Sequence, residues 1–265
     1  MDILRELSDM RRADAERRQK AVSMDEMLRR AAAAPAPRDF AAPFQDGRPG
    51  VIAELKRASP SEGLIRDDFR PVELARELEA AGAAALSVLC EPHRFLGDES
   101  YLASVRSATS LPLLYKDFLT TRYQIAAARA VGADAILLIA AVLDDAELAG
   151  LLGFARETGL EALVETHCAD EISRAVQAGA TMIGVNCRDL RDFSTDVSLL
   201  ERLIGGIPRP CVRVAESGMH DASSVARARA AGADGFLVGT ALMRAPSPGA
   251  RLKDLASRLP PITCN

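Results

Sequence analysis

The chain has 265 residues, of which 48% are hydrophobic and 26% charged, a composition typical of a folded globular protein rather than a disordered one. Its formal net charge of −4 argues against a general nucleic-acid-binding surface, but leaves room for a local positive pocket that takes a small anion. The longest wholly apolar run, residues 135–143, is far too short to cross a bilayer, so we expect no membrane partner.

The first predicted elements are one or two amphipathic helices in residues 1–30, where apolar side chains recur at helical spacing. The arginines of this segment are interleaved with acids and predict a solvated helical face. A proline-rich connector follows, and from residue 51 onward short β-type runs alternate with helical stretches. We predict strands at 51–56, 83–89, 111–116, 133–140, 160–165, 181–186, 210–215 and 235–239, and helices that include 71–81, 121–131, 144–158 and 221–231.

An internal repeat supports this division into eight strand–helix units. Gly82, Gly132, Gly179 and Gly232 each end a predicted helix and precede an alanine and an apolar run. They lie 47 to 53 residues apart, which is two units per period. We therefore predict a parallel (β/α)8 TIM barrel over residues 49–265, with an N-terminal helical extension over residues 1–48; a doubly wound open sheet is the alternative.

Lysine and cysteine usage gives two further clues. Only four of the 33 basic residues are lysines, and two of these, Lys56 and Lys116, end predicted strands. An ammonium group can release a proton and a guanidinium effectively cannot, so these positions predict chemistry rather than charge alone. The five cysteines are scattered, and the charged first twenty residues lack the apolar core of a signal peptide, so we expect a cytoplasmic protein.

Ionisable residues recur at the carboxyl ends of the predicted strands, where such barrels place their active sites. The four odd-numbered strands end in Glu54 and Lys56, in Lys116, in Glu165 and in Glu216, and the sixth strand is followed by Asn186 and Arg188. A ring of lysine and glutamate can hold an acid and a base close together; the alternative is an ion-pair network that closes the barrel. His167 follows Glu165, but no further ligand pattern predicts a metal site.

Small residues at the last two strand ends predict a phosphate site. In these barrels, phosphate commonly binds the loops after strands seven and eight beside a short helix, here Ala241–Arg244. Two ordinary turn glycines are the alternative interpretation. The residues concerned are Ser217 and Gly218, Gly239 and Thr240, with Ser59 and Ser61 as additional hydroxyl donors.

These residues fall into motifs that resemble the indole-3-glycerol-phosphate synthase family of tryptophan biosynthesis. The resemblance runs from Ile3 to about Ala245, and it includes an N-terminal extension that caps the barrel mouth. The motifs that carry it are IAELKRASPS at 52–61, LSVL at 86–89, KDF at 116–118, NCRDL at 186–190 and AESG at 215–218. Two positions depart from the family pattern, since Asp98 and Thr240 stand where serine is common.

The resemblance implies ring closure, decarboxylation and dehydration of 1-(2-carboxyphenylamino)-1-deoxyribulose 5-phosphate, with no metal or organic cofactor. It implies that Lys116 is the general acid, that Glu165 is the acid/base partner in dehydration, and that Lys56 contacts the departing carboxylate. Either Lys56 or Glu165 could donate the proton in dehydration. The remaining implied residues are Glu54, Asn186, Arg188 and Glu216 for orientation, Phe118 for the aromatic ring, and Ser59, Ser217, Gly218, Gly239 and Thr240 for the phosphate.

Two alternatives to this function stay open at this point. Another sugar-phosphate barrel, such as an isomerase or a Schiff-base aldolase, would share the phosphate site. A barrel that binds sugar phosphates without turnover would not need two lysines in an arginine-rich chain. We expect a monomer or weak homo-oligomer with a small-molecule sugar-phosphate substrate and no nucleic-acid partner.

Overall fold

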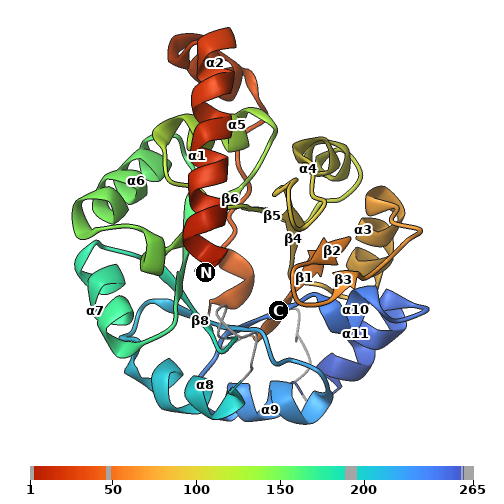
Figure 1. Cartoon of the computed structure of the whole chain (residues 1–265). Coiled ribbons are helices and arrows are strands. Elements are labelled where there is room, and N and C mark those ends of the chain that lie inside the picture. Colours follow the sequence, from red (N-terminus) through yellow and green to blue (C-terminus); the bar gives the residue numbers. More distant parts are fainter. Residues whose placement is uncertain (1–2, 46–48, 189–195, 258, 260–265) are drawn as a thin grey trace.

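The structure of the protein, a computed structural model, describes residues 3–45, 49–188, 196–257 and 259. Eight parallel strands of these residues close into a barrel in the order β1, β10, β9, β8, β7, β6, β5, β4, and β4 pairs back onto β1 (Figure 1). The strands are β1 Gly50–Leu55, β4 Ala85–Leu89, β5 Leu113–Lys116, β6 Ala135–Ile139, β7 Glu161–Thr166, β8 Met182–Asn186, β9 Val212–Glu216 and β10 Gly235–Val238. The predicted (β/α)8 TIM barrel is therefore confirmed, and the open sheet is excluded.

Helices surround the barrel and cover the outer faces of its strands (Figure 1). Because side chains fill the inside of the barrel and helices cover the outside, the strands are buried on both faces, as in β1 and β4. The helices are α3 Pro71–Ala80, α4 Glu99–Arg106, α5 Arg122–Ala130, α6 Asp145–Glu157, α7 Ala169–Gln177, α8 Val197–Leu203, α9 Ala222–Ala230, α10 Thr240–Met243 and α11 Pro248–Ala256. Short 3-10 turns lie at Ala42–Phe44 (η1), Ala140–Val142 (η2) and Ile204–Gly206 (η3).

The four repeat glycines end their helices as predicted. Gly82, Gly132, Gly179 and Gly232 have φ values of 95°, 92°, 84° and 106°, a left-handed conformation that costs glycine little. The alanine after each glycine donates its backbone N–H back to the helix, as Ala83 does to the carbonyl of Leu78. Several strands consequently begin later than predicted, because the residues before them still complete a helix end.

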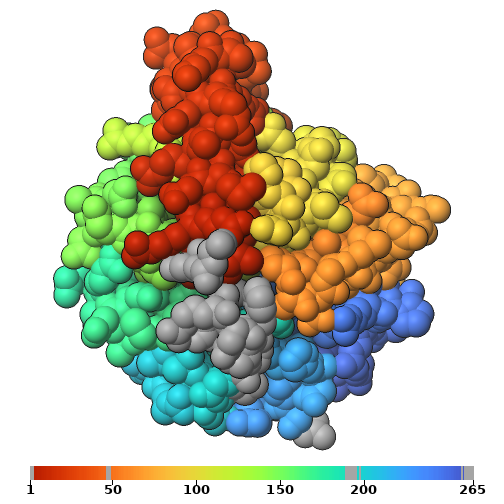
Figure 2. Space-filling model, viewed as in Figure 1, coloured from red at the N-terminus to blue at the C-terminus, as the bar shows by residue number. Residues whose placement is uncertain are grey.

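The N-terminal segment forms two helices, α1 Ile3–Ala21 and α2 Met24–Ala33. Helix α1 lies across one end of the barrel, whereas α2 projects beyond the rim and packs against α5 (Figures 1 and 2). At the opposite end, the Phe44 ring lies against Gly50 and Gly235, the first residues of β1 and β10. The predicted boundary after residue 48 adjoins residues 46–48, which lie outside the described residues, and it stays a prediction.

No helix in the described ranges is both long and apolar enough to cross a membrane.

Candidate active site

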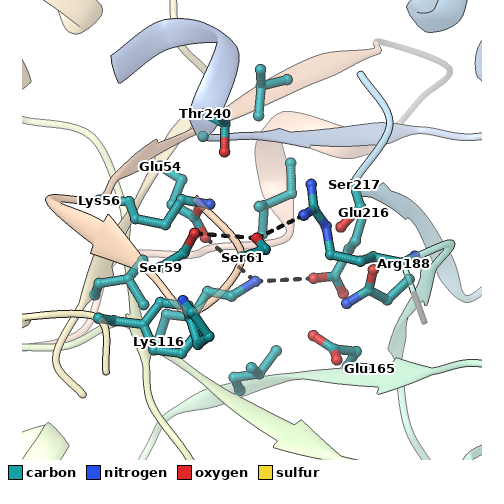
Figure 3. A pocket seen from close by; sticks show the side chains of 18 of the residues that line it. Glu54, Lys56, Ser59, Ser61, Lys116, Glu165, Arg188, Glu216, Ser217 and Thr240 are labelled. Atoms are coloured by element: carbon teal, nitrogen blue, oxygen red, sulfur yellow. Dashed lines mark hydrogen bonds and ion pairs between the residues drawn. The ribbon is translucent and has the colours of Figure 1, made fainter. Parts of the chain in front are cut away.

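One pocket opens at the carboxyl ends of the barrel strands, beneath the start of α1 (Figure 3). Ile3, Leu4 and Leu7 of α1 form part of its wall. The structure brings all of the predicted site residues to this pocket: Glu54, Lys56, Ser59, Lys116, Phe118, Glu165, Asn186, Arg188, Glu216, Ser217, Gly218, Gly239 and Thr240. Their common location follows from barrel closure, which gathers the ends of eight parallel strands around one axis.

Lys116 lies at the centre of a buried charge cluster. Its Nζ atom is 3.2 Å from Oε2 of Glu216 and 3.5 Å from Oε1 of Glu54. The other carboxylate oxygen of Glu54 lies 2.8 Å from Nζ of Lys56. The side chains of Glu54 and Glu216 are 3% and 1% exposed, so these ion pairs are screened only weakly by solvent. Figure 3 shows the Lys116 side chain directed at Glu216 across the pocket.

The surrounding charges keep Lys116 protonated. Burial acts to lower the pKa of Lys116, but the charges of Glu216, Glu54 and Glu165 outweigh it and raise the pKa above the ordinary lysine value. Burial also acts to raise the pKa of Glu54, but Lys56 and Lys116 lower it overall, so Glu54 is an anion. An ammonium group held in this way can donate a proton, whereas a Schiff-base lysine needs a free amine.

Glu216 differs from Glu54 in its protonation. Burial, together with the charges of Glu165 and Glu54 and against the attraction of Lys116, raises the pKa of Glu216 to about 7. Three carboxyl groups crowd around one lysine, so they cannot all ionise at equal cost. The cluster can therefore take up or release a proton near neutral pH, which an inert ion-pair network does not require.

Two glycines make room for these carboxylates. A Cβ atom at Gly239 would overlap the Oε2 atom of Glu54, and one at Gly184 on β8 would overlap Oε1 of Glu216. The absence of a side chain at Gly239 therefore makes room for the Glu54 carboxylate, as well as for any phosphate that binds there. Gly184 was not predicted as a site residue, although a glycine inside a predicted strand often indicates that another group comes close to the backbone there.

The loop after β1 is tied to the end of β8. This loop contains the short hairpin of β2 Ala58–Ser59 and β3 Gly63–Leu64. Ser61 in its turn accepts a hydrogen bond of 2.9 Å from Nη1 of Arg188, and its hydroxyl lies 3.4 Å from that of Ser59 (Figure 3). The backbone N–H of Arg188 donates to the side chain of Asn186 at 3.0 Å. Asp189 and Leu190 of the same motif lie outside the described residues.

The small residues predicted to hold phosphate all line this pocket. Ser217 and Gly218 both have left-handed backbones, with φ values of 63° and 71°. This conformation strains a serine, and such strain is concentrated at functional sites. Gly239 directly precedes α10, which begins at Thr240.

Two aromatic rings, Phe95 and Phe118, line the pocket, and a helix cap follows Phe95 in the chain. Phe118 is 8% exposed, and its ring centroid lies 6.2 Å from that of Phe95. Asp98, where the family commonly has serine, caps α4 by accepting the backbone N–H of Ser100 at 2.7 Å. The departure at Asp98 therefore keeps a side chain that can cap the helix after this loop.

Sequence reasoning missed the link between α1 and β5. Arg11 was expected on a solvated helical face, but its Nε and Nη2 atoms donate to the Asp117 carboxylate at 3.0 and 2.7 Å. Asp117, beside Lys116, has a side chain only 1% exposed, and the same carboxylate accepts the Phe118 N–H at 2.8 Å. No local sequence pattern pairs these two residues, because they are 106 positions apart in the chain.

Two of the histidines contact carboxylates. His93 Nε2 lies 2.7 Å from the carboxylate of Asp14 on α1. His167 contacts Glu165, at 3.4 Å, and Glu171 on α7, at 3.3 Å. Among the described residues, no group of three or more histidine, cysteine, aspartate or glutamate side chains could hold a metal ion.

Comparison with known proteins identifies the family of this chain. The family model of indole-3-glycerol phosphate synthase matches residues 4–255. The chain belongs to the indole-3-glycerol phosphate synthase family. It is similar to indole-3-glycerol phosphate synthase of Acidithiobacillus ferrooxidans, with 46% identity over 96% of this chain and 98% of that protein. It is also similar to indole-3-glycerol phosphate synthase 2 of Streptomyces coelicolor, with 51% identity over 85% of this chain and 87% of that protein.

Membership of the indole-3-glycerol phosphate synthase family makes the chain a decarboxylating lyase of tryptophan biosynthesis that acts on a small phosphate-bearing molecule. Among solved structures, 3-hexulose-6-phosphate synthase from Salmonella typhimurium matches with a TM-score of 0.64 and 14% identity, over 78% of this chain and 97% of that one. Thiamine phosphate pyrophosphorylase from Pyrococcus furiosus matches with a TM-score of 0.60 and 17% identity, over 80% of this chain and 95% of that one. At these identities the two likenesses show the barrel fold alone.

Proposed function

We propose that Lys116 is the general acid with which this pocket closes the indole ring of 1-(2-carboxyphenylamino)-1-deoxyribulose 5-phosphate. The observation that carries the proposal is the buried Lys116 ammonium, 3.2 Å from Glu216 and 3.5 Å from Glu54. The substrate ketone needs a proton as the aryl carbon attacks it, because the carbonyl oxygen gains the electron pair of the broken π bond. Lys116 supplies that proton, and the ketone oxygen becomes a hydroxyl group.

The two later steps use the other charged residues of the pocket. The carboxylate leaves as carbon dioxide, and its bonding electrons return to the ring and restore aromaticity. Lys56, 2.8 Å from Glu54, contacts this carboxylate before it leaves. The hydroxyl group then departs as water with a proton from Glu165 or Lys56, and loss of a proton from the neighbouring carbon gives indole-3-glycerol phosphate.

The remaining residues bind and orient the substrate in this proposal. Phe118 packs on the aromatic ring, while Glu54, Asn186, Arg188 and Glu216 orient the reacting groups and the sugar hydroxyls. Ser59, Ser217, Gly218, Gly239 and Thr240 hold the phosphate. The left-handed turn at Ser217 and Gly218 supports a close approach of the backbone to an anion.

We also propose that the enzyme works in the cytoplasm as a monomer or weak homo-oligomer, without a nucleic-acid partner, metal or organic cofactor. The acidic net charge of −4 and the scattered cysteines support these proposals. The chemistry itself supports the last of them, since each step needs only an acid, a base and positive charge.

The proposed role of Lys116 predicts the kinetics of a Lys116→Arg variant, measured by the fluorescence of the indole product. A guanidinium keeps the charge but does not readily release a proton, so kcat should fall on the order of 10²–10⁴-fold with a much smaller change in KM. Lys253→Arg on the exposed face of α11 is the matched control and should keep wild-type kinetics. Borohydride added with substrate should trap no adduct. A stable adduct on Lys116 would overturn the proposal in favour of Schiff-base chemistry.

A further inference from the structure

His167 lies just beyond β7, between the pocket and helix α7. Its Nε2 atom is 3.4 Å from Oε1 of Glu165, and its Nδ1 atom is 3.3 Å from Oε2 of Glu171. The same Glu171 oxygen accepts the backbone N–H of His167 at 2.7 Å. Glu171 therefore holds both the ring and the backbone of His167, and the Nε2 atom is left facing the Glu165 carboxylate.

The Nε2 atom of His167 is placed to interact with the Glu165 carboxylate. It is buried, and no hydrogen-bond partner meets it among the described residues. A buried polar atom without a partner destabilises the fold, and the Glu165 carboxylate lies 3.4 Å away as an acceptor. The separation of 3.4 Å is long for a hydrogen bond, but such contacts commonly shorten when substrate binds.

We propose that His167 is a positioning residue for Glu165 and shares one proton with it, while Glu171 fixes the imidazole ring for this role. The inference rests on the acid/base role of Glu165 proposed above. His167 itself is not among the residues that line the pocket, so it acts through Glu165 rather than on the substrate.

The proton can occupy either of two positions in this pair. With Nδ1–H donating to Glu171, a charged His167 donates its Nε2 proton to the Glu165 carboxylate. When that proton moves to Oε1 of Glu165, the imidazolium becomes neutral imidazole and the carboxylate becomes a carboxylic acid. No other bond changes. Glu165 can thus take this proton from His167 and donate it to the departing hydroxyl group in dehydration, and the proton that the neighbouring carbon then loses restores the pair.

The surrounding charges favour the protonated histidine before the reaction. Burial acts to lower the pKa of His167, but the hydrogen bond to Glu171 and the charges of Glu165, Glu171 and Glu216 together raise it. The carboxylates come from three elements: the end of β7, helix α7 and the end of β9. Lys116, at the end of β5, is attracted to the same Glu165 carboxylate. Histidine titrates near neutral pH, so the pair can change state during turnover.

A double-mutant cycle tests whether His167 acts through Glu165. His167→Gln should lower kcat about tenfold or more, leave KM nearly unchanged and shift a limb of the kcat–pH profile. Added to Glu165→Gln, the same substitution should cause no further loss, because the group it positions is already gone. Glu171→Gln should act in the same direction as His167→Gln, whereas the matched control Asp170→Asn, an exposed acid beside it, should not. Equal losses in both backgrounds would overturn the proposal.

A spectroscopic test does not depend on activity. The chain has three histidines, so ¹⁵N-imidazole NMR can follow His167 individually. Glu165→Gln should lower the pKa of His167 by about one unit, since it removes a negative charge 3.4 Å away. An unchanged pKa would overturn the proposal even if His167→Gln failed to fold. Full activity of Glu165→Gln would instead refute the role of Glu165, so the two failures are distinguishable.

Discussion

The Arg11–Asp117 pair provides a sharp test of how α1 is coupled to the active site. Arg11→Met puts an unbranched apolar side chain in place of the arginine and removes all three hydrogen bonds to the Asp117 carboxylate. The carboxylate, 1% exposed, is then left with the N–H of Phe118 at 2.8 Å and the hydroxyl of Tyr115 at 3.5 Å. A buried charge that loses its partner in this way typically costs 3–5 kcal/mol of unfolding free energy, about 3 kcal/mol here because protonation relieves part of it.

The loss should depend on pH, and its sign follows from the pKa of Asp117. Burial raises this pKa above the ordinary aspartate value, although Arg11 opposes the shift, so removing Arg11 should raise it further. A carboxyl group whose pKa is raised in the folded state stabilises the fold at low pH. The unfolding free energy therefore falls as pH rises through that pKa. The variant should therefore be about 3 kcal/mol less stable than wild type at pH 8, and about 1 kcal/mol less stable at pH 5.

Urea unfolding at both pH values measures these differences. The matched control is Arg12→Met on the same helix, because Arg12 and Glu147 form a pair at 3.4 Å with side chains 41% and 38% exposed. Such an exposed pair contributes less than about 1 kcal/mol. Arg11→Met combined with Asp117→Asn should recover most of the loss at pH 8. Equal effects of Arg11→Met and Arg12→Met at both pH values would refute the reasoning.

Two further predictions concern parts of the fold away from the catalytic cluster. Burial and then the nearby Asp39 raise the pKa of Glu161 to about 7, so the stability that this group contributes is present at pH 5 and lost as pH rises through 7. Glu161→Gln should therefore raise the unfolding free energy by about 1–2 kcal/mol at pH 8, allowing for solvent screening, and change it little at pH 5. Equal changes in melting temperature at both pH values would contradict this prediction. Asp98→Ala should lower the unfolding free energy measured in urea by about 1 kcal/mol, because α4 loses its N-terminal cap, whereas Asp98→Ser should change it little. Similar losses in the two variants would rule out the capping role.

Local sequence patterns were enough to predict the elements of the barrel and the residue types at its mouth. Strand runs, helix periodicity and the glycine stops at Gly82 and Gly132 are local properties, which depend on neighbours a few residues away. The rarity of lysine also singled out Lys56 and Lys116 without any coordinates. The order of strands then follows from the right-handed crossover that each strand–helix unit requires.

Which charged side chains pair with one another depends on how distant segments of the chain pack together. Lys116 and Glu216 are 100 residues apart in sequence, and Arg11 and Asp117 are 106 apart, so no local pattern pairs them. Their contacts depend on the register across the barrel, in which Asn186 lies opposite Glu216, and on where α1 crosses the mouth. The same closure places Gly184 beside the Glu216 carboxylate, a site where any side chain would overlap it. Burial then sets the protonation of these groups, because desolvation and neighbouring charge act only once the chain has folded around them.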